Sequence, residues 1–219
     1  MNAPLHGQTH LHRVELDPKE YRDTVTPFWC PGCGHHGVLT SLLRSLSEVG
    51  VDPSFIVNVS GIGCSSRLPY FVKSYKMHTL HGRAGPVATG VQLARPDLAV
   101  VVTGGDGDGF SIGGGHMSHL ARKNINMTYL LMDNRIYGLT KGQTSPRSSK
   151  GFVTKTTPHG NTETPLSVIS MAIASGCTFV AQGFAMDRRS LMKIINKAMD
   201  HKGFSYVNIF TPCVTFNKF

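Results

Sequence analysis

The stretch LAVVVTGGDGDG, residues 98–109, decides the fold. Its first half is an almost unbroken run of apolar, mostly β-branched residues, which is typical of a strand buried on both faces of a sheet. A second run of this kind, MTYLLMD (127–133), follows a helix-like segment at 112–123. A strand, a helix and another strand in this order predict two parallel strands joined by a right-handed crossover.

The same alternation continues along the chain. It predicts further strands at 55–59, 178–182 and 206–210. It predicts further helices at 37–48, 86–95, 166–175 and 188–201. The fold class is therefore α/β, with a doubly wound parallel sheet. The 219 residues suit one domain with a sizeable core. We place this domain at 25–219, after an N-terminal extension at 1–24.

Ligand-binding residues are expected at one edge of this sheet, because α/β folds bind ligands where parallel strands end. Four segments follow predicted strands: SGIGCSSR (60–67), GGDGDG (104–109), NRIYGLTKGQ (134–143) and TPC (211–213). The polar stretch 140–165 has no periodicity. A loop of that length in a compact domain is usually functional or disordered.

Composition excludes several classes of protein. Lys and Arg total 22 against 13 Asp and Glu, which gives a net charge of +9. This charge favours acidic partners or phosphorylated ligands, but the basic residues are scattered, which disfavours nucleic acid. No apolar run is long enough to span a membrane, and the first 25 residues lack a signal-peptide layout, so a cytoplasmic protein is expected. Five cysteines, an odd number, argue against a disulfide framework.

The glycine loop at 104–109 allows few interpretations. A dinucleotide fingerprint would need a third glycine where Phe110 or Ile112 stands, and a Walker A loop would need Gly-Lys-Ser/Thr. Asp106 and Asn134 end two strands that we expect to be neighbours, so a carboxylate and an amide oxygen can share one Mg²⁺. Backbone N–H groups of the loop would then approach a diphosphate. The alternative is an ordinary turn in which Asp106 or Asp108 caps the helix. Gly-Asp-Gly followed at this distance by Asn resembles the signature of thiamine-diphosphate enzymes.

The cysteines also leave alternatives. Cys30 and Cys33 have the spacing of a thioredoxin-type dithiol, but no buried strand precedes them. Cys64 and Cys213 are expected at the same sheet edge, and four thiolates suit either zinc or a [4Fe–4S] cluster. A redox cluster has a use beside a thiamine site, whereas a structural zinc has none. Cys177 is expected to be a buried core thiol.

Six stretches together resemble one known family. They are WCPGCGHHG, GIGCSSR, HGRAGPVATGVQLARPDL, GGDGDGFSIGGGHMSHLARKN, MDNRIYGLTKGQTSPRS and TPCVTFNK. They resemble the β subunit of 2-oxoacid:ferredoxin oxidoreductases, in particular the 2-oxoglutarate (2-oxoglutarate synthase) type, and the similarity covers nearly all of 25–218. The resemblance implies thiamine diphosphate, Mg²⁺ and one [4Fe–4S] cluster as cofactors. It implies an α subunit, ferredoxin and coenzyme A as partners, in an (αβ)2 assembly with no nucleic acid and no membrane. The implied reaction converts 2-oxoglutarate, coenzyme A and oxidised ferredoxin to succinyl-CoA, CO2 and reduced ferredoxin. Pyruvate or broad specificity, and a non-catalytic zinc or iron–sulfur scaffold, are the alternatives.

The resemblance also implies roles for individual residues. The magnesium ligands are Asp106, Asn134 and the carbonyl of Ile136. The remaining positions around the cofactor are Gly61, Ile62, Gly63, Cys64, Gly105, Gly107 and Asp108. The cluster ligands are Cys30, Cys33, Cys64 and Cys213. The candidate catalytic residues are Arg67 and Lys141, near the 2-oxoacid, and His35, which is expected to touch the cofactor.

Two features differ from a complete enzyme of this family. The glutamate that activates thiamine diphosphate comes from the other chain in this family, and Glu48 and Glu163 lie in no matching motif. The chain alone is therefore expected to be inactive. Family members usually continue beyond TPCVTFNK, so either a C-terminal segment is missing here or this member is short.

Overall fold

A six-stranded parallel sheet forms the centre of the computed structural model, which describes residues 13–218. The strands are β1 (Ile56–Ser60), β2 (Tyr75–His78), β3 (Ala99–Gly105), β4 (Met127–Asp133), β5 (Phe179–Phe184) and β6 (Phe204–Phe210). Their order is β2-β1-β3-β4-β6-β5, and every neighbouring pair is parallel. This topology confirms the predicted doubly wound α/β sheet.

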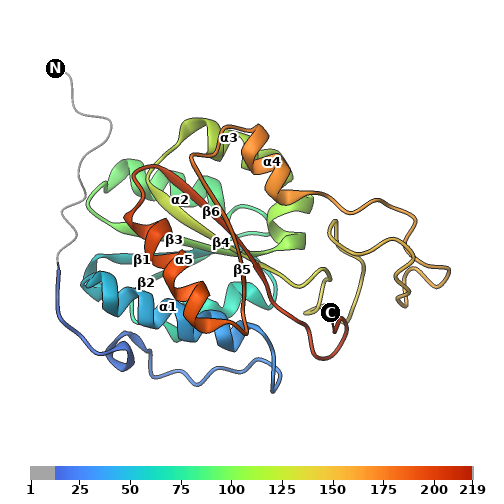
Figure 1. Cartoon of the computed structure of the whole chain (residues 1–219), viewed down its shortest axis with the longest axis horizontal. Helices are drawn as coiled ribbons and strands as arrows, with labels where there is room; N and C mark the ends of the chain where they lie inside the picture. Colours follow the sequence, from blue (N-terminus) through green and yellow to red (C-terminus); the bar gives the residue numbers. More distant parts are fainter. Residues whose placement is uncertain (1–12, 219) are drawn as a thin grey trace.

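Helices cover both faces of the sheet, as Figure 1 shows. One face carries α1 (His35–Val49) and α5 (Arg188–Asp200). The other face carries α2 (Ala84–Ala94), α3 (Gly114–Lys123) and α4 (Val168–Ala174). Successive side chains of a strand point to opposite faces, so β4 sends Leu130 and Met132 into the first core and Tyr129 and Leu131 into the second. Burial on both faces explains why the sequence of β4 is apolar throughout. No helix within 13–218 is both long and apolar enough to cross a bilayer.

Strand β2 was not predicted. All four of its residues are exposed, and it pairs with β1 at the edge of the sheet. A four-residue strand with exposed side chains has no buried apolar run by which its sequence could be recognised. Each predicted strand and helix overlaps an observed one. The helix predicted from 112 instead begins as a π-helical turn at Asp108–Ile112 and continues as α3.

The described part of the predicted N-terminal extension packs against α1. Tyr21 is fully buried in the first core, and the Ser47 hydroxyl donates to the Leu16 carbonyl at 2.6 Å. Residues 1–12 lie outside the described range, and the domain boundary at residue 24 stays a prediction.

The strand order reverses beside β1. The chain leaves β1 for β2 on one side and returns to β3 on the other. The loops that follow β1 and β3 therefore diverge, and in α/β folds such a reversal opens a crevice at the carboxyl edge of the sheet.

Candidate functional site

A cleft of about 470 Å³ lies at the carboxyl edge, above the ends of β1, β3 and β4. The residues that line it are Ile62, Gly63, Cys64, Ser65, His81, Gly105, Asp106, Gly107, Asp108, Asn134, Ile136, Tyr137, Gly138, Leu139 and Thr140. Apart from Gly61 and His35, every residue predicted to bind the cofactor lines this cleft. The structure therefore brings these residues together from three separate loops.

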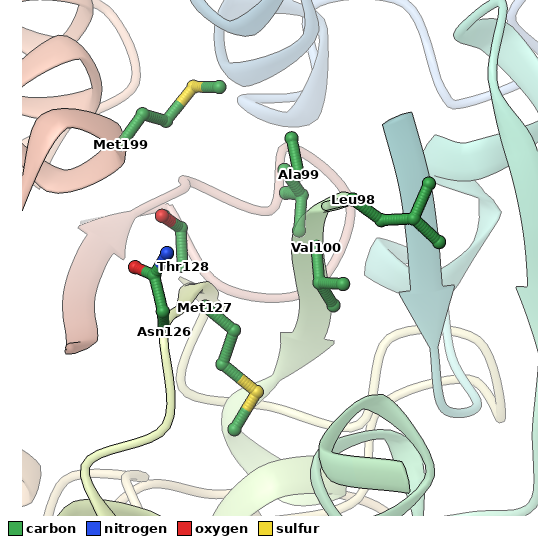
Figure 2. Close-up of a pocket in the computed structure, with 8 residues that line it drawn as sticks. Leu98, Ala99, Val100, Asn126, Met127, Thr128 and Met199 are labelled. Carbon is green, nitrogen blue, oxygen red and sulfur yellow. The ribbon is translucent and has the colours of Figure 1, made fainter. Parts of the chain in front are cut away.

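A second hollow lies at the opposite edge, where β3 and β4 begin (Figure 2). It has a volume of about 350 Å³ and is lined by Leu98, Ala99, Val100, Val101, Asn126, Met127, Thr128 and Met199. None of these side chains is charged or carries a thiol, so this hollow offers no group suited to catalysis or metal binding.

Asp106 lies in a position suited to a metal ligand. Strands β3 and β4 are neighbours, as predicted, and the backbone N–H of Asn134 donates to Oδ1 of Asp106 at 3.3 Å. Asp106 is buried, and burial together with the charge of Asp133 raises its pKa to about 7. A buried carboxylate is costly unless a cation compensates it. The hard oxygens of Asp106 and Asn134 fit Mg²⁺ in this role.

Asp108 connects its own loop to the loops that contain Ile62 and Gly82. Its Oδ1 accepts hydrogen bonds from the backbone N–H groups of Ile62 at 2.9 Å and Gly82 at 2.7 Å. A Cβ on Gly61 would lie 2.1 Å from Oδ2 of Asp108, so only glycine fits there. The hydrogen-bond partners of Asp106 and Asp108 lie on other loops, so neither acts as the plain helix cap of the alternative interpretation.

We expect replacement of Asp108 by Ala to destabilise the fold by about 2–5 kcal/mol, because two backbone donors lose their acceptor. Asp108→Asn should cost less, since an amide oxygen can accept the same two bonds. Thermal unfolding of both variants measures the difference. Equal melting temperatures for the Ala variant and the wild type would show that the two bonds contribute nothing.

Four of the five cysteines gather beside the cleft and form what we call the four-cysteine site: Cys30, Cys33, Cys64 and Cys213. The sulfurs of Cys64 and Cys213 lie 3.8 and 3.7 Å from the point that a Cβ on Gly138 would occupy. The loop that carries Cys30 and Cys33 sits on the end of β6, because the Gly34 N–H donates to the Pro212 carbonyl at 3.2 Å. This close approach needs glycine, since a Cβ at Gly34 would lie 2.9 Å from the backbone of Thr211.

The thiols of this site influence one another. Burial, together with the charges of the other three cysteines, raises the pKa of Cys33 to about 11. Burial also raises the pKa of Cys64, while Arg67 lowers it. No three His, Cys, Asp or Glu side chains within 13–218 are placed so that they could hold one metal ion. The four sulfurs are thus close enough for each thiolate to disfavour ionisation of the others.

Cys177 lies apart from these four. It is partly buried against the second core, and its thiol donates to the Phe179 carbonyl at 3.1 Å. This position agrees with the predicted core thiol.

The three candidate catalytic residues lie in different places. His35 is buried beneath the four-cysteine site, with Nδ1 3.4 Å from Sγ of Cys33, and burial lowers its pKa to about 3. The Arg67 guanidinium stacks 5.0 Å from the centre of the Phe28 ring. Neither His35 nor Arg67 lines the cleft. Lys141 is exposed beside Thr140 at the rim, in the left-handed region with φ of 77°. Their catalytic roles stay predictions.

Sequence reasoning missed four residues of the site. Tyr137 covers the glycine turn and donates from its hydroxyl to the Gly107 carbonyl at 3.3 Å. Ser145, Arg147 and Asp133 form buried contacts next to Asp106. The position of Ser145 and Arg147 in the long polar loop was the one available signal, because such loops are often functional.

Comparison with known proteins identifies the family of this chain. Residues 61–209 match the family of thiamine pyrophosphate enzymes, C-terminal TPP binding domain. The chain is 47% identical to 2-oxoacid:ferredoxin oxidoreductase 2, subunit beta, of Aeropyrum pernix, over 91% of this chain and 64% of that protein. It is 49% identical to 2-oxoglutarate oxidoreductase subunit KorB of Mycobacterium tuberculosis, over 91% of this chain and 53% of that protein.

A solved structure supports the assignment. The 2-oxoglutarate:ferredoxin oxidoreductase of Magnetococcus marinus, with 2-oxoglutarate, coenzyme A and succinyl-CoA bound, is 58% identical and superposes with a TM-score of 0.93. The match covers 94% of this chain and 71% of that chain. The chain belongs to the 2-oxoacid:ferredoxin oxidoreductase β-subunit family. This membership confirms the family predicted from the motifs. As a β subunit, the chain spans 53–64% of the length of the Mycobacterium and Aeropyrum relatives.

Proposed function

We propose that this β subunit supplies the diphosphate-binding and electron-accepting half of a 2-oxoacid:ferredoxin oxidoreductase, most specifically one that acts on 2-oxoglutarate. The observation that carries the proposal is the position of Cys64. This residue lines the cleft beside Asp106 and also belongs to the four-cysteine site. A reaction in the cleft and an electron acceptor at the cysteines would thus be in direct contact.

The cleft residues fit a Mg²⁺–diphosphate group. Asp106 and Asn134 offer side-chain oxygens, and Ile136 offers its carbonyl, as ligands that Mg²⁺ prefers. Gly105 and Gly107 add no side chains of their own to the turn, which favours close approach of its backbone N–H groups to the phosphates. The role of these cleft residues would be to bind the Mg²⁺–diphosphate group and fix its orientation.

We favour a [4Fe–4S] cluster over zinc at the four cysteines. A structural zinc ion is redox-inert, whereas a cluster beside the cleft could accept electrons from a reaction there. Four thiolates ligate a [4Fe–4S] cluster. When bound, thiamine diphosphate supplies the reactive carbon for decarboxylation, and the cluster accepts electrons one at a time.

The catalytic site needs a second chain. Glu48 is bonded to Asn196 and Glu163 lies on the polar loop, and neither lines the cleft. We assign the glutamate that activates the cofactor to the α subunit, as the family resemblance implies, in an (αβ)2 assembly. Coenzyme A is the acyl acceptor, and acidic ferredoxin suits the net charge of +9.

Substrate-dependent reduction of ferredoxin tests this proposal. The chain, purified anaerobically with its α subunit, should reduce ferredoxin when given 2-oxoglutarate and coenzyme A. The kcat/KM for 2-oxoglutarate should exceed that for pyruvate by about tenfold or more. A preference for pyruvate would support the alternative substrate, and no reduction with either would favour a non-catalytic scaffold.

In the iron-free chain, we expect iodoacetamide at pH 8 to alkylate Cys30 before Cys33. Cys30 is exposed, whereas Cys33 is partly buried and its pKa is raised to about 11. Roughly one Cys33 thiol in a thousand is then ionised at pH 8, and each further pH unit up to 10 should speed its labelling about tenfold. Peptide mass spectrometry measures both rates. Equal labelling of the two thiols at pH 8 would contradict this expectation.

A further inference from the structure

Three side chains outside the cleft support the proposed magnesium site through hydrogen bonds. The brace, as we name it, consists of Asp133, Ser145 and Arg147. Asp133 ends β4 immediately before Asn134, and the other two come from the long polar loop. None of them lines the cleft.

Ser145 acts directly on Asp106. Its hydroxyl donates to Oδ2 of Asp106, while the backbone N–H of Asn134 donates to Oδ1. Both carboxylate oxygens are therefore oriented by neutral donors. Each oxygen keeps a second lone pair, so the carboxylate can still bind a cation.

Arg147 fixes the turn that carries Ser145. Its Nε donates to Oδ2 of Asp133 at 2.9 Å, and its Nη1 donates to the Leu166 carbonyl. Its backbone N–H donates to the Ser145 hydroxyl oxygen at 3.2 Å. The carboxylate of Asp133 is fully buried and the Arg147 side chain is only 13% exposed, so water competes little for this ion pair. One side chain thus links the end of β4, the Ser145 turn and the segment before α4.

Ser148 completes the connection. It accepts from the Ser145 N–H at 2.9 Å and donates to the Arg135 carbonyl at 2.6 Å. The turn at 145–148 is therefore fastened to the turn that begins at Asn134. The residues on either side of the proposed metal position cannot shift independently.

We propose that Ser145 and Arg147 are positioning residues that aim the Asp106 carboxylate at the divalent cation. This inference rests on the proposed function, which makes Asp106 a metal ligand. Mg²⁺ demands near-ideal octahedral geometry, so a small rotation of one carboxylate lowers its affinity. Partners that orient a metal ligand typically change metal affinity 10- to 100-fold.

Binding of Mn²⁺, followed by electron paramagnetic resonance, tests the role of Ser145. The protein is the full chain assembled with its α subunit and saturated with thiamine diphosphate. Ser145→Ala should weaken Mn²⁺ binding about 10- to 100-fold and alter the Mn²⁺ spectrum. Ser145→Thr, which keeps the hydroxyl, should recover most of the affinity. Ser118→Ala, on the exposed face of α3, should match the wild type.

The role of Arg147 needs a charge-balanced variant. Arg147→Met alone leaves a buried unpaired carboxylate and can fail to fold. The double variant Asp133→Asn with Arg147→Met removes both charges. If it folds with a wild-type melting temperature and still binds Mn²⁺ at least about tenfold more weakly, Arg147 positions the site. Wild-type affinity in the double variant would show that Arg147 only neutralises a buried charge.

The outcomes separate the two proposals. If the wild-type complex binds no Mn²⁺, the proposed metal site is wrong. If the wild type binds Mn²⁺ and Ser145→Ala binds it equally well with an unchanged spectrum, the metal site stands and the brace is overturned.

Discussion

Asp106→Asn is expected to weaken Mg²⁺-dependent binding of thiamine diphosphate by at least about 100-fold, because a neutral amide replaces the one charged ligand of the proposed site. The amide has nearly the same size as the carboxylate, so the cleft should keep its shape. Isothermal titration calorimetry of the assembled complex, with and without Mg²⁺, measures the effect. Asp200→Asn, an exposed change at the end of α5, is the matched control.

The same Asp106→Asn change should lower cofactor affinity but should not lower the stability of the metal-free protein. The pKa of Asp106 is about 7 in the fold, against an ordinary aspartate value of 3.8. A carboxyl whose pKa is raised by folding becomes less favourable to the fold as pH rises from about 4 to above 7. The Asn variant lacks this charge, so at pH 8 it should melt no lower than the wild type. A variant that binds the cofactor normally, or that simply unfolds, would contradict the assignment of Asp106 as the metal ligand.

Cys213→Ser is expected to remove the iron–sulfur cluster. Iron should fall from about four atoms to fewer than one per chain, because a hydroxyl replaces one of four thiolate ligands. Ferredoxin reduction should be lost with it. Binding of thiamine diphosphate should persist, since Cys213 does not line the cleft. Iron and acid-labile sulfide are measured on the same anaerobic preparation as the calorimetry.

Cys177→Ser provides the control for this change. Cys177 lies against the second core, away from the other four cysteines. Its replacement should leave iron and sulfide at wild-type levels. If Cys213→Ser keeps a full complement of iron, or if Cys177→Ser loses it, the four-cysteine site is wrongly composed.

The sheet and most of the cleft could be predicted from the sequence because both depend on short-range patterns. A buried parallel strand appears in the sequence as an apolar run. The residues that follow such runs lie at the carboxyl edge of the sheet. The adjacency of Asp106 and Asn134 follows from this rule alone. Strand β2 could not be found this way, because it has four exposed residues and no apolar run.

The brace could not be predicted, because its contacts depend on how a long loop folds back. The sequence does not indicate that Ser145 contacts Asp106 or that Arg147 contacts Asp133, because residues 140–165 show no periodicity. His35 was expected at the cofactor, and that role stays a prediction. In the structure α1 begins at His35, and the side chain is buried beside Cys33.

The most direct test of the central claim is the metal and cofactor content of the assembled protein. The chain should be purified anaerobically with its α subunit, and iron, acid-labile sulfide, zinc and thiamine diphosphate should be measured together. We predict about four irons, four sulfides and one thiamine diphosphate for each copy of this chain. Stoichiometric zinc without sulfide would contradict the claim that the cysteines beside the cleft accept electrons from it.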